Sequence, residues 1–146
     1  MDLSGLKWPL IILIVIGIGW LLSSGGVNYM INNFTEATPG EDLERDKIDE
    51  AGLTRVGGYL LMLWRYEKAA QVFRTAINRY GEDGANYWYN IYRLAKCLDR
   101  MDQYQKSYNR LQELIKANAS QYDDRVPNND NLSLRAQKLK EIHELQ

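Results

Sequence analysis

Few side chains in this sequence have the types and spacing that a catalytic site needs. Cys97 is the only cysteine and His143 the only histidine among the 146 residues. Internal disulfides, cysteine-pair zinc sites and histidine pairs are therefore excluded. The sequence also lacks a Ser-His-Asp set, a glycine-rich phosphate loop and a Cys-x-x-Cys motif. We expect a protein that is not an enzyme and uses no cofactor or metal ion, with Cys97 buried as a small apolar residue and His143 solvated.

Two acidic pairs remain as candidates for chemistry. Glu82-Asp83 and Asp123-Asp124 both lie in segments that read as loops. Neither pair has the apolar surroundings that would raise a carboxyl pKa for acid-base work. The pair at 123–124 also lacks the ligand spacing of a calcium loop. We expect both pairs to be solvated.

The side chains best suited to recognition form an aromatic cluster, Tyr87-Trp88-Tyr89-Asn90-Ile91-Tyr92. Four aromatic rings within six helical residues point all round a helix, so they cannot all be in the core. Exposed aromatic rings beside arginine are typical anchor residues of protein interfaces. Tyr89 and Tyr92 therefore either contact a partner or pack against the C-terminal segments, and the sequence leaves both open. Trp64, at a predicted turn, fits an exposed position and a core position equally well.

An apolar run near the N-terminus determines where these residues work. No charged side chain occurs from Trp8 to Leu22, and the uncharged stretch continues beyond it. A bilayer core about 30 Å thick needs roughly 20 helical residues, which Trp8 to Val27 supplies. At 1.5 Å per residue, Trp8 and Tyr29 are about 31 Å apart, a spacing that suits an aromatic belt at each interface. Pro9 falls in the first turn, where proline is tolerated.

Three interpretations of this run compete. In a cleaved secretory signal, Lys7 is the basic region, 10–22 the apolar region and Ser23-Ser24-Gly25 the cleavage site. A buried soluble helix that is apolar all round needs a larger core than this chain can build. We expect the third possibility, an uncleaved anchor. Its small residues Gly17, Gly19 and Ser23, with Trp20 beside them, are of the kind that allows close helix contacts in lipid.

Positive charges near the run predict its orientation. Lys7 and the amino terminus flank one end, whereas the first basic residue beyond the other end is Arg45. Because basic residues stay on the cytoplasmic side, we expect a cytoplasmic N-terminus. The predicted location is the bacterial inner membrane, crossed once, with the C-terminal domain in the periplasm.

The rest of the chain reads as a linker and one small domain. The predicted parts are an anchor helix over 1–31, a linker over 32–46 that contains Pro39-Gly40, and a helical domain over 47–146. The acidic stretch 41–50 is expected to be a solvated face, with an acidic docking strip as the alternative. A net charge of -1 gives no reason to expect nucleic-acid binding.

Apolar residues recur at helical spacing throughout the domain, and no segment alternates with period two. Short breaks at 64–65, 81–84 and 99–102 predict antiparallel helix neighbours. A final helix is predicted over about 131–145, after a longer loop. The four apolar stripes before the last helix are Leu53, Val56, Gly57, Leu60 and Leu61; Ala69, Ala70, Phe73, Ala76 and Ile77; Ile91, Leu94, Ala95 and Leu98; and Tyr104, Tyr108, Leu111, Leu114 and Ile115. The inward face of the last helix is predicted to consist of Leu132, Ala136, Leu139 and Ile142.

An internal repeat relates these segments, with a period of about 38 residues that falls in the range of helical-repeat proteins. Tyr66-Glu67-Lys68-Ala69 matches Tyr104-Gln105-Lys106-Ser107, and the further pairs are Gly57 with Ala95, Phe73 with Leu111 and Ala76 with Leu114. The pattern resembles the tetratricopeptide repeat (TPR) family, whose helix-turn-helix unit has about 34 residues. The family positions are occupied in order by Leu53, Val56-Gly57, Leu60, Ala69, Phe73 and Ala76. In the second unit, Ala95 replaces the glycine and Ser107 an alanine. Small residues at 57 and 69 let two helices approach closely, while Phe73 fills the space between units.

The resemblance implies an all-α fold in which a single N-terminal transmembrane helix precedes a short TPR-like solenoid of two helix pairs and a C-terminal capping helix. It also implies a concave surface that receives peptides. By position, the residues facing that surface are Leu61, Met62, Tyr89, Tyr92, Lys96, Asp99 and Arg100.

We therefore expect a non-catalytic scaffold or accessory subunit of a larger membrane complex. Its expected partners are other protein subunits and membrane lipid. A self-assembling structural protein (a ring, tubule or filament at a membrane) is the main alternative, and a membrane-tethered assembly or chaperone factor is the third.

Overall fold

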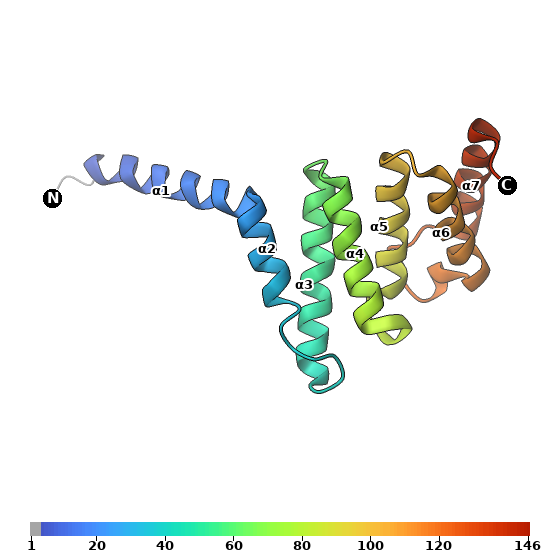
Figure 1. The fold of residues 1–146 in the computed structure, drawn as a ribbon, viewed down its shortest axis with the longest axis horizontal. Helices are drawn as coiled ribbons and strands as arrows, with labels where there is room; N and C mark the ends of the chain where they lie inside the picture. Colours follow the sequence, from blue (N-terminus) through green and yellow to red (C-terminus); the bar gives the residue numbers. More distant parts are fainter. Residues whose placement is uncertain (1–3) are drawn as a thin grey trace. The chain divides into compact units, whose positions relative to one another are not determined.

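The computed structural model describes residues 4–146, with side chains described from Gly5 onward, and this part of the chain is helical with no strand (Figure 1). It contains seven α-helices and two short 3-10 turns. The predictions of an all-α chain and of one apolar N-terminal helix are confirmed. Residues up to Glu36 form one compact unit and Ala37–Gln146 form a second. The amino terminus, whose positive charge contributes to the predicted orientation, lies outside the described residues.

The first unit consists of α1 (Ser4–Leu22) and α2 (Ser24–Asn33). The 18 residues Gly5–Leu22 are long and apolar enough to cross a membrane, and none of them is buried in the protein. At 1.5 Å per residue they span about 27 Å. Trp8 is 72% exposed and Trp20 50%. Apart from Lys7 and the ring contact of Trp20 with Tyr29, the described surface of α1 is therefore almost entirely apolar and exposed.

The helix expected over Trp8–Val27 is interrupted at Ser23, and the prediction of one continuous helix is wrong. Ser23 has an extended backbone, and its hydroxyl donates to the Trp20 carbonyl oxygen and accepts from the Gly26 N–H. A Cβ at Gly26 would collide with that carbonyl, so glycine makes the close turn possible. Trp20 and Tyr29 are therefore brought together, with ring centroids 5.8 Å apart. Gly19 and Ser23 no longer share a helix face, and the belt spacing expected for one straight helix does not apply.

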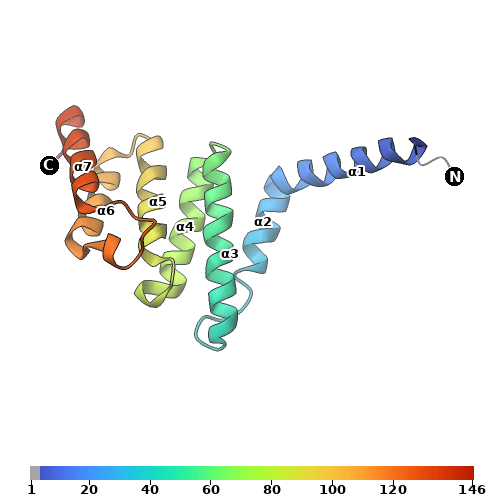
Figure 2. The ribbon, with the colours of Figure 1, turned by 180° about the vertical axis from the view of Figure 1, so that it is seen from behind.

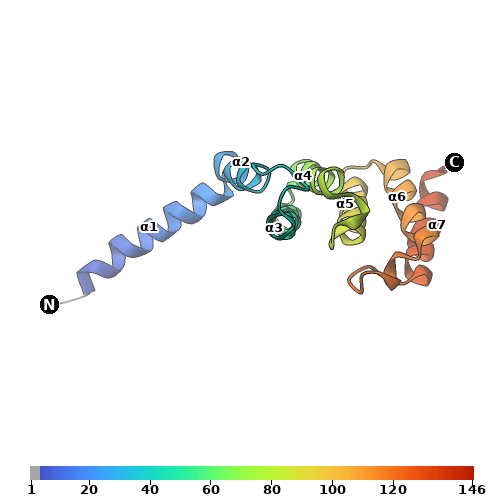
Figure 3. The ribbon, with the colours of Figure 1, turned by 90° about the horizontal axis from the view of Figure 1, so that it is seen from below.

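The second unit is a row of helices in which each packs against the next (Figures 1 and 2). The row consists of α3 (Leu43–Met62), α4 (Tyr66–Tyr80), α5 (Tyr87–Arg100), α6 (Tyr104–Ala117) and α7 (Asn129–His143). The 3-10 turns η1 (Gly81–Asp83) and η2 (Ala119–Gln121) follow α4 and α6. Figure 3 looks onto the ends of α3 and α4, which lie side by side as neighbours in the row. The short connections between consecutive helices force antiparallel neighbours.

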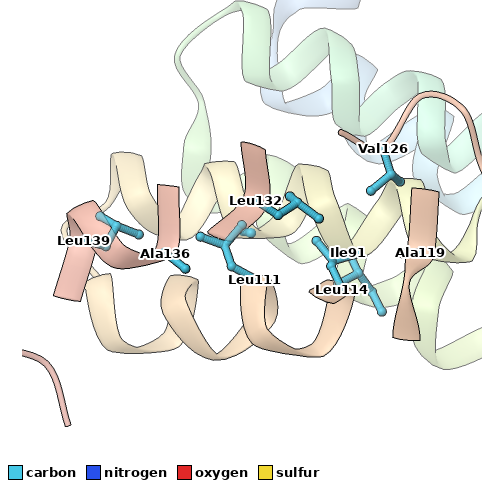
Figure 4. Packing of buried hydrophobic residues seen from close by; sticks show 9 residues of the cluster. Ile91, Leu111, Leu114, Ala119, Val126, Leu132, Ala136 and Leu139 are labelled. Carbon is cyan, nitrogen blue, oxygen red and sulfur yellow. The ribbon is translucent and has the colours of Figure 1, made fainter. Parts of the chain in front are cut away.

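The core follows the predicted stripes. Leu53, Leu60, Phe73, Ile91 and Leu114 are fully buried. Towards the C-terminus, a cluster from α5, α6 and α7 also takes in Ala119 and Val126 from the segment between α6 and α7 (Figure 4). That segment is therefore packed onto the helices rather than free of them.

Two helix turns, one in each repeat, have the same backbone geometry. Trp64 and Asp102 both have positive φ, 58° and 59°. The next residue in each turn donates its N–H to a leucine carbonyl oxygen at 2.9 Å, Arg65 to Leu60 and Gln103 to Leu98. The repeat seen in the side chains is thus also a repeat of local structure.

Matched residue pairs set how closely the helices of each pair approach. A Cβ at Gly57 would lie 2.7 Å from the buried ring of Phe73. At the equivalent places the second pair has Ala95 and the smaller Leu111, both buried. Ser107 adds a hydrogen bond of 2.8 Å from its hydroxyl to the Ala95 carbonyl oxygen. The larger residue at 95 is therefore compensated by a smaller one at 111.

Several predictions about exposure are wrong. Ile142 is 61% exposed, because α7 is the last helix of the row and nothing described packs on its outer side. Asp49 and Glu50, expected on a solvated face, are buried, because each has a polar partner within the protein. His143 is half-buried, since its ring stacks on Tyr104 with centroids 3.5 Å apart.

Substitution of Gly57 by alanine should destabilise the second unit. The new methyl group meets the Phe73 ring, and overpacking of this kind costs about 1–3 kcal/mol. Urea unfolding followed by circular dichroism measures the loss. Adding Phe73→Leu, which copies the Ala95–Leu111 pair, should restore part of it.

Gly58→Ala is the matched control. Its added Cβ would meet only the end of the flexible Arg93 side chain, at 3.4 Å. Alanine is the better helix former by about 1 kcal/mol, so this variant should be at least as stable as the parent. Equal stability of the two alanine variants would contradict the packing described for Gly57.

Candidate functional site

A cavity of about 360 Å³ lies between α5, α6, α7 and the loop before α7. Four of the predicted contact residues line it: Tyr92, Lys96, Asp99 and Arg100. Its other lining side chains are those of Ala95, Ser107, Leu111, Pro127, Asn131, Leu132 and Arg135. Leu111 and Leu132, which lie close together in the core cluster, give it an apolar floor (Figure 4). The cavity therefore combines an apolar base with polar and charged walls.

Cations predominate at the rim of this cavity. Arg135 of α7 is paired with Asp99 of α5, so the two helices are joined across the opening. The Lys96 ammonium lies 5.3 Å from the centroid of the Tyr92 ring. Lys96 and Arg100 are exposed, and neither forms an ion pair with any of residues 4–146. The rim thus carries three cationic groups and one carboxylate, that of Asp99, whose charge Arg135 balances. The remaining positive charge favours a ligand that carries an anionic group.

Tyr89 does not belong to the cavity. Its ring lies between two guanidinium groups, that of Arg125 at 4.3 Å and that of Arg93 at 5.6 Å from the ring centroid. Arg125 lies in the loop between α6 and α7, so Tyr89 packs against a C-terminal segment. Of the two alternatives open for these tyrosines, packing therefore describes Tyr89, whereas Tyr92 lines an open cavity.

The other two aromatic rings of the cluster also serve packing. Tyr87 and Trp88 meet edge to face with centroids 4.9 Å apart. Trp88 stacks at 6.2 Å on Tyr122, a residue of the same C-terminal loop. Rings on several sides of α5 are accommodated because this loop covers one side of the helix.

The predicted contact residues of α3 lie elsewhere. Leu61 is half-buried and Met62 is 75% exposed, and neither lines the cavity between α5 and α7. The seven predicted residues therefore fall into three places: the cavity, the Tyr89 packing site and the end of α3. Trp64, beside Met62, is 77% exposed, so its core alternative is wrong.

A series of polar contacts that starts at the buried Glu50 holds the loop that borders the cavity. The Glu50 carboxylate accepts the Asn86 N–H at 2.8 Å, and the Asn86 side chain accepts from Arg125 at 2.9 Å. Arg125 is in turn paired with Asp123 at 2.6 Å. Sequence reasoning missed this series of contacts. The available signal was spacing, because Asp49 and Glu50 precede Leu53 by four and three residues and so belong to its face of α3.

The environment of Asp123 keeps its carboxylate charged. Burial by itself raises the pKa of Asp123, but the hydrogen bonds from the Arg125 side chain and backbone N–H outweigh it, and the pKa lies below its ordinary value. The expectation that this acidic pair is solvated is wrong for Asp123, whose side chain is 7% exposed. The Asp123–Arg125 pair can therefore hold the loop over the neutral pH range.

Cys97 and the acidic groups do not form a metal site among the described residues. Cys97 is fully buried and unpaired, as predicted. In the part of the chain that the structure describes, no group of three or more His, Cys, Asp or Glu side chains could hold a metal ion. The cavity between α5, α6 and α7 therefore remains as the candidate binding site.

Comparison with known proteins gives no family assignment: no family model, curated protein or solved structure matches the chain.

The Cys97 thiol should be almost inert in the folded protein. Burial raises its pKa to about 11, so roughly one thiol in a thousand is ionised at pH 8. Labelling by a maleimide should be at least about a hundredfold slower than in the urea-unfolded chain, because the thiolate is the reactive form. From pH 7 to pH 9 the native rate should rise about tenfold per pH unit without levelling, since the thiol is still mostly protonated. Labelling of the native chain as fast as the unfolded one would refute the burial of Cys97.

Proposed function

We propose that this chain is a non-catalytic scaffold or accessory subunit that holds a docking surface at a membrane. The observation that carries the proposal is the cavity between α5 and α7, lined by Tyr92, Lys96 and Arg100. An apolar floor with an aromatic wall and cationic rim is the composition of an interface pocket. No chemistry beyond binding is assigned to it.

The proposed architecture is a TPR-like solenoid of two helix pairs, α3–α4 and α5–α6, with α7 as its capping helix. Support comes from the repeated turns at Trp64 and Asp102, from the close approach of Gly57 to Phe73, and from the burial of Ala95 and Leu111 in one core cluster. The outward side of α7 is largely polar, as a terminal repeat needs for solubility.

The proposed anchor is α1, spanning the bilayer once with the second unit outside the cytoplasm. Its length and composition support this role. Lys7 at one end and the lack of basic residues before Arg45 at the other support a cytoplasmic N-terminus in a bacterial inner membrane.

The proposed occupant of the cavity is a protein segment that presents a carboxylate beside an apolar side chain. The carboxylate would meet Lys96 and Arg100, and the apolar group would rest on Leu111 and Leu132. Charge-assisted hydrogen bonds to lysine and arginine are about twice as strong as neutral ones, so they would select such a segment.

Self-assembly and transient client binding are the two alternative proposals. A second copy of this chain could occupy the same cavity and build a ring, tubule or filament at the membrane. A client-holding factor would bind partners only transiently, so a permanent, fixed stoichiometry would count against it. Identifying the molecule bound in the cavity therefore distinguishes the scaffold, self-assembly and client-binding proposals.

A photo-crosslinker in place of Tyr92 should capture the partner. With p-benzoylphenylalanine at this position, illumination in cells should give one defined adduct, because the side chain lines the cavity. Lys96→Glu combined with Arg100→Glu should remove the adduct by reversing the rim charge. Mass spectrometry of the product identifies the captured chain.

The same crosslinker at Leu134, 68% exposed on α7 and outside the cavity, is the control. Equal adducts from both positions would show that the cavity is not selective and would refute its role. A product of twice the chain's 17.0 kDa would instead favour self-assembly.

A cysteine introduced at Glu41 should reveal the orientation. Glu41 is exposed in the segment before α3, and the native Cys97 is buried and gives little background. We expect a membrane-impermeant maleimide to label Glu41→Cys in intact cells. Labelling only after the membrane is opened would show that the second unit faces the cytoplasm.

A further inference from the structure

The turn between α3 and α4 exposes two large apolar side chains to solvent. Met62 is 75% exposed and Trp64 77%. Neither contributes to the core of the second unit, and neither lines the cavity beside α5. We call this pair the apolar tip.

The backbone at Trp64 shows that this residue is not there to stabilise the turn. Its φ of 58° is left-handed, a conformation that costs a residue with a Cβ about 1 kcal/mol and that glycine or asparagine adopts more easily. The equivalent position of the second pair has Asp102, one of the polar residues suited to it. Trp64 thus has a backbone conformation that is unfavourable for a residue with a Cβ, and it also exposes a large apolar ring to water. Retained strain of this kind points to a function outside the fold.

Cationic side chains line a groove to which Trp64 of the apolar tip also belongs. Trp64 lines an open groove of about 1280 Å³ between α4 and α6. Five cations line this groove, Arg65, Lys68, Arg74, Lys106 and Arg110, against the two carboxylates of Glu67 and Glu113. Lys68 and Lys106 lie in the first turns of α4 and α6, and neither pairs with a carboxylate of the described residues. The surface next to Trp64 is therefore positive.

We propose that the apolar tip and its flanking cations dock on the surface of an anionic bilayer. Tryptophan favours the interface between lipid headgroups and acyl chains. Each lysine or arginine close to an anionic leaflet adds about 1 kcal/mol of attraction. The inference rests on the proposed function, because α1 is what keeps the second unit at a membrane.

Because α1 is proposed to tether the chain to a bilayer, a bilayer is favoured over an acidic protein as the binding partner of the apolar tip. A short linker, 34–42, separates α2 from α3, so a bilayer crossed by α1 stays within a few tens of ångströms of the second unit. A weak surface contact suffices at such an effective concentration. An exposed tryptophan and methionine at the outer point of a turn also suit insertion into a headgroup layer, whereas a partner helix would lie along the groove.

The test uses the full chain in lipid nanodiscs whose acyl chains carry bromine, which quenches nearby tryptophan fluorescence. The discs consist of phosphatidylcholine alone or of phosphatidylcholine mixed with phosphatidylglycerol. Subtracting the emission of Trp64→Phe isolates the signal of Trp64 from those of Trp8, Trp20 and Trp88. We expect this signal to be quenched and blue-shifted in the anionic discs and much less so in the neutral ones.

Charge variants test whether the cations provide the attraction. Lys68→Gln with Lys106→Gln should lower the ratio of docked to free units about 30-fold, and the quenching of Trp64 with it. The matched control is Lys47→Gln with Lys116→Gln. It removes the same charge from exposed lysines at the other ends of α3 and α6 and should leave the quenching unchanged.

Three outcomes would overturn the inference. If the chain stays with the discs but Trp64 remains unquenched in anionic lipid, the tip does not dock and the anchor proposal survives. If poly-glutamate shifts the Trp64 emission in neutral discs and anionic lipid does not, the groove binds an acidic polypeptide instead. If the chain does not remain with the discs in size-exclusion chromatography, the proposed anchor fails and this inference fails with it.

Discussion

The close approach of paired helices is the constraint on which the second unit depends. Gly57 has no Cβ, so the ring of Phe73 can lie where a side chain would otherwise be. The second pair reaches the same arrangement with Ala95 and a smaller Leu111, and Ser107 adds a hydrogen bond to the Ala95 carbonyl. Because each helix contacts mainly its neighbours in the row, this local fit is repeated along the unit.

That row leaves different surfaces for different tasks. The cavity beside α5 carries Tyr92 and a cationic rim, and it is bordered by a loop that the Glu50–Asn86–Arg125 contacts hold in place. The groove between α4 and α6 is open and lined mainly by cations, and Trp64 is one of its lining residues. We propose the first surface for a protein segment and the second for a lipid surface. The proposed scaffold, tethered to a membrane by α1, would use both.

Helical periodicity predicted most of the core because one apolar stripe per helix is enough to order a row of helices. Leu53, Phe73, Ile91 and Leu114 are buried for this reason. Features that depend on contacts distant in sequence were not predictable in this way. Glu50 is buried because the backbone N–H of Asn86, far along the chain, donates to its carboxylate. Ile142 is exposed because no further helix follows α7, which a stripe on α7 alone cannot reveal.

Four of the eleven residues that line the candidate site could be predicted, for the same physical reason. Tyr92, Lys96, Asp99 and Arg100 share one side of α5, so their spacing brings them to one cavity. Pro127 and Arg135 complete it from a loop and from α7, and spacing within α5 says nothing about them. The break at Ser23 likewise depends on a hydroxyl that caps α2 within an otherwise apolar segment.

Native mass spectrometry after mild detergent extraction tests most directly whether the chain holds a docking surface at a membrane. We predict a defined complex in which this 17.0 kDa chain is bound at fixed stoichiometry to other polypeptides. Release of the chain as a monomer without companions, or as a homogeneous large homo-oligomer, would contradict the scaffold account.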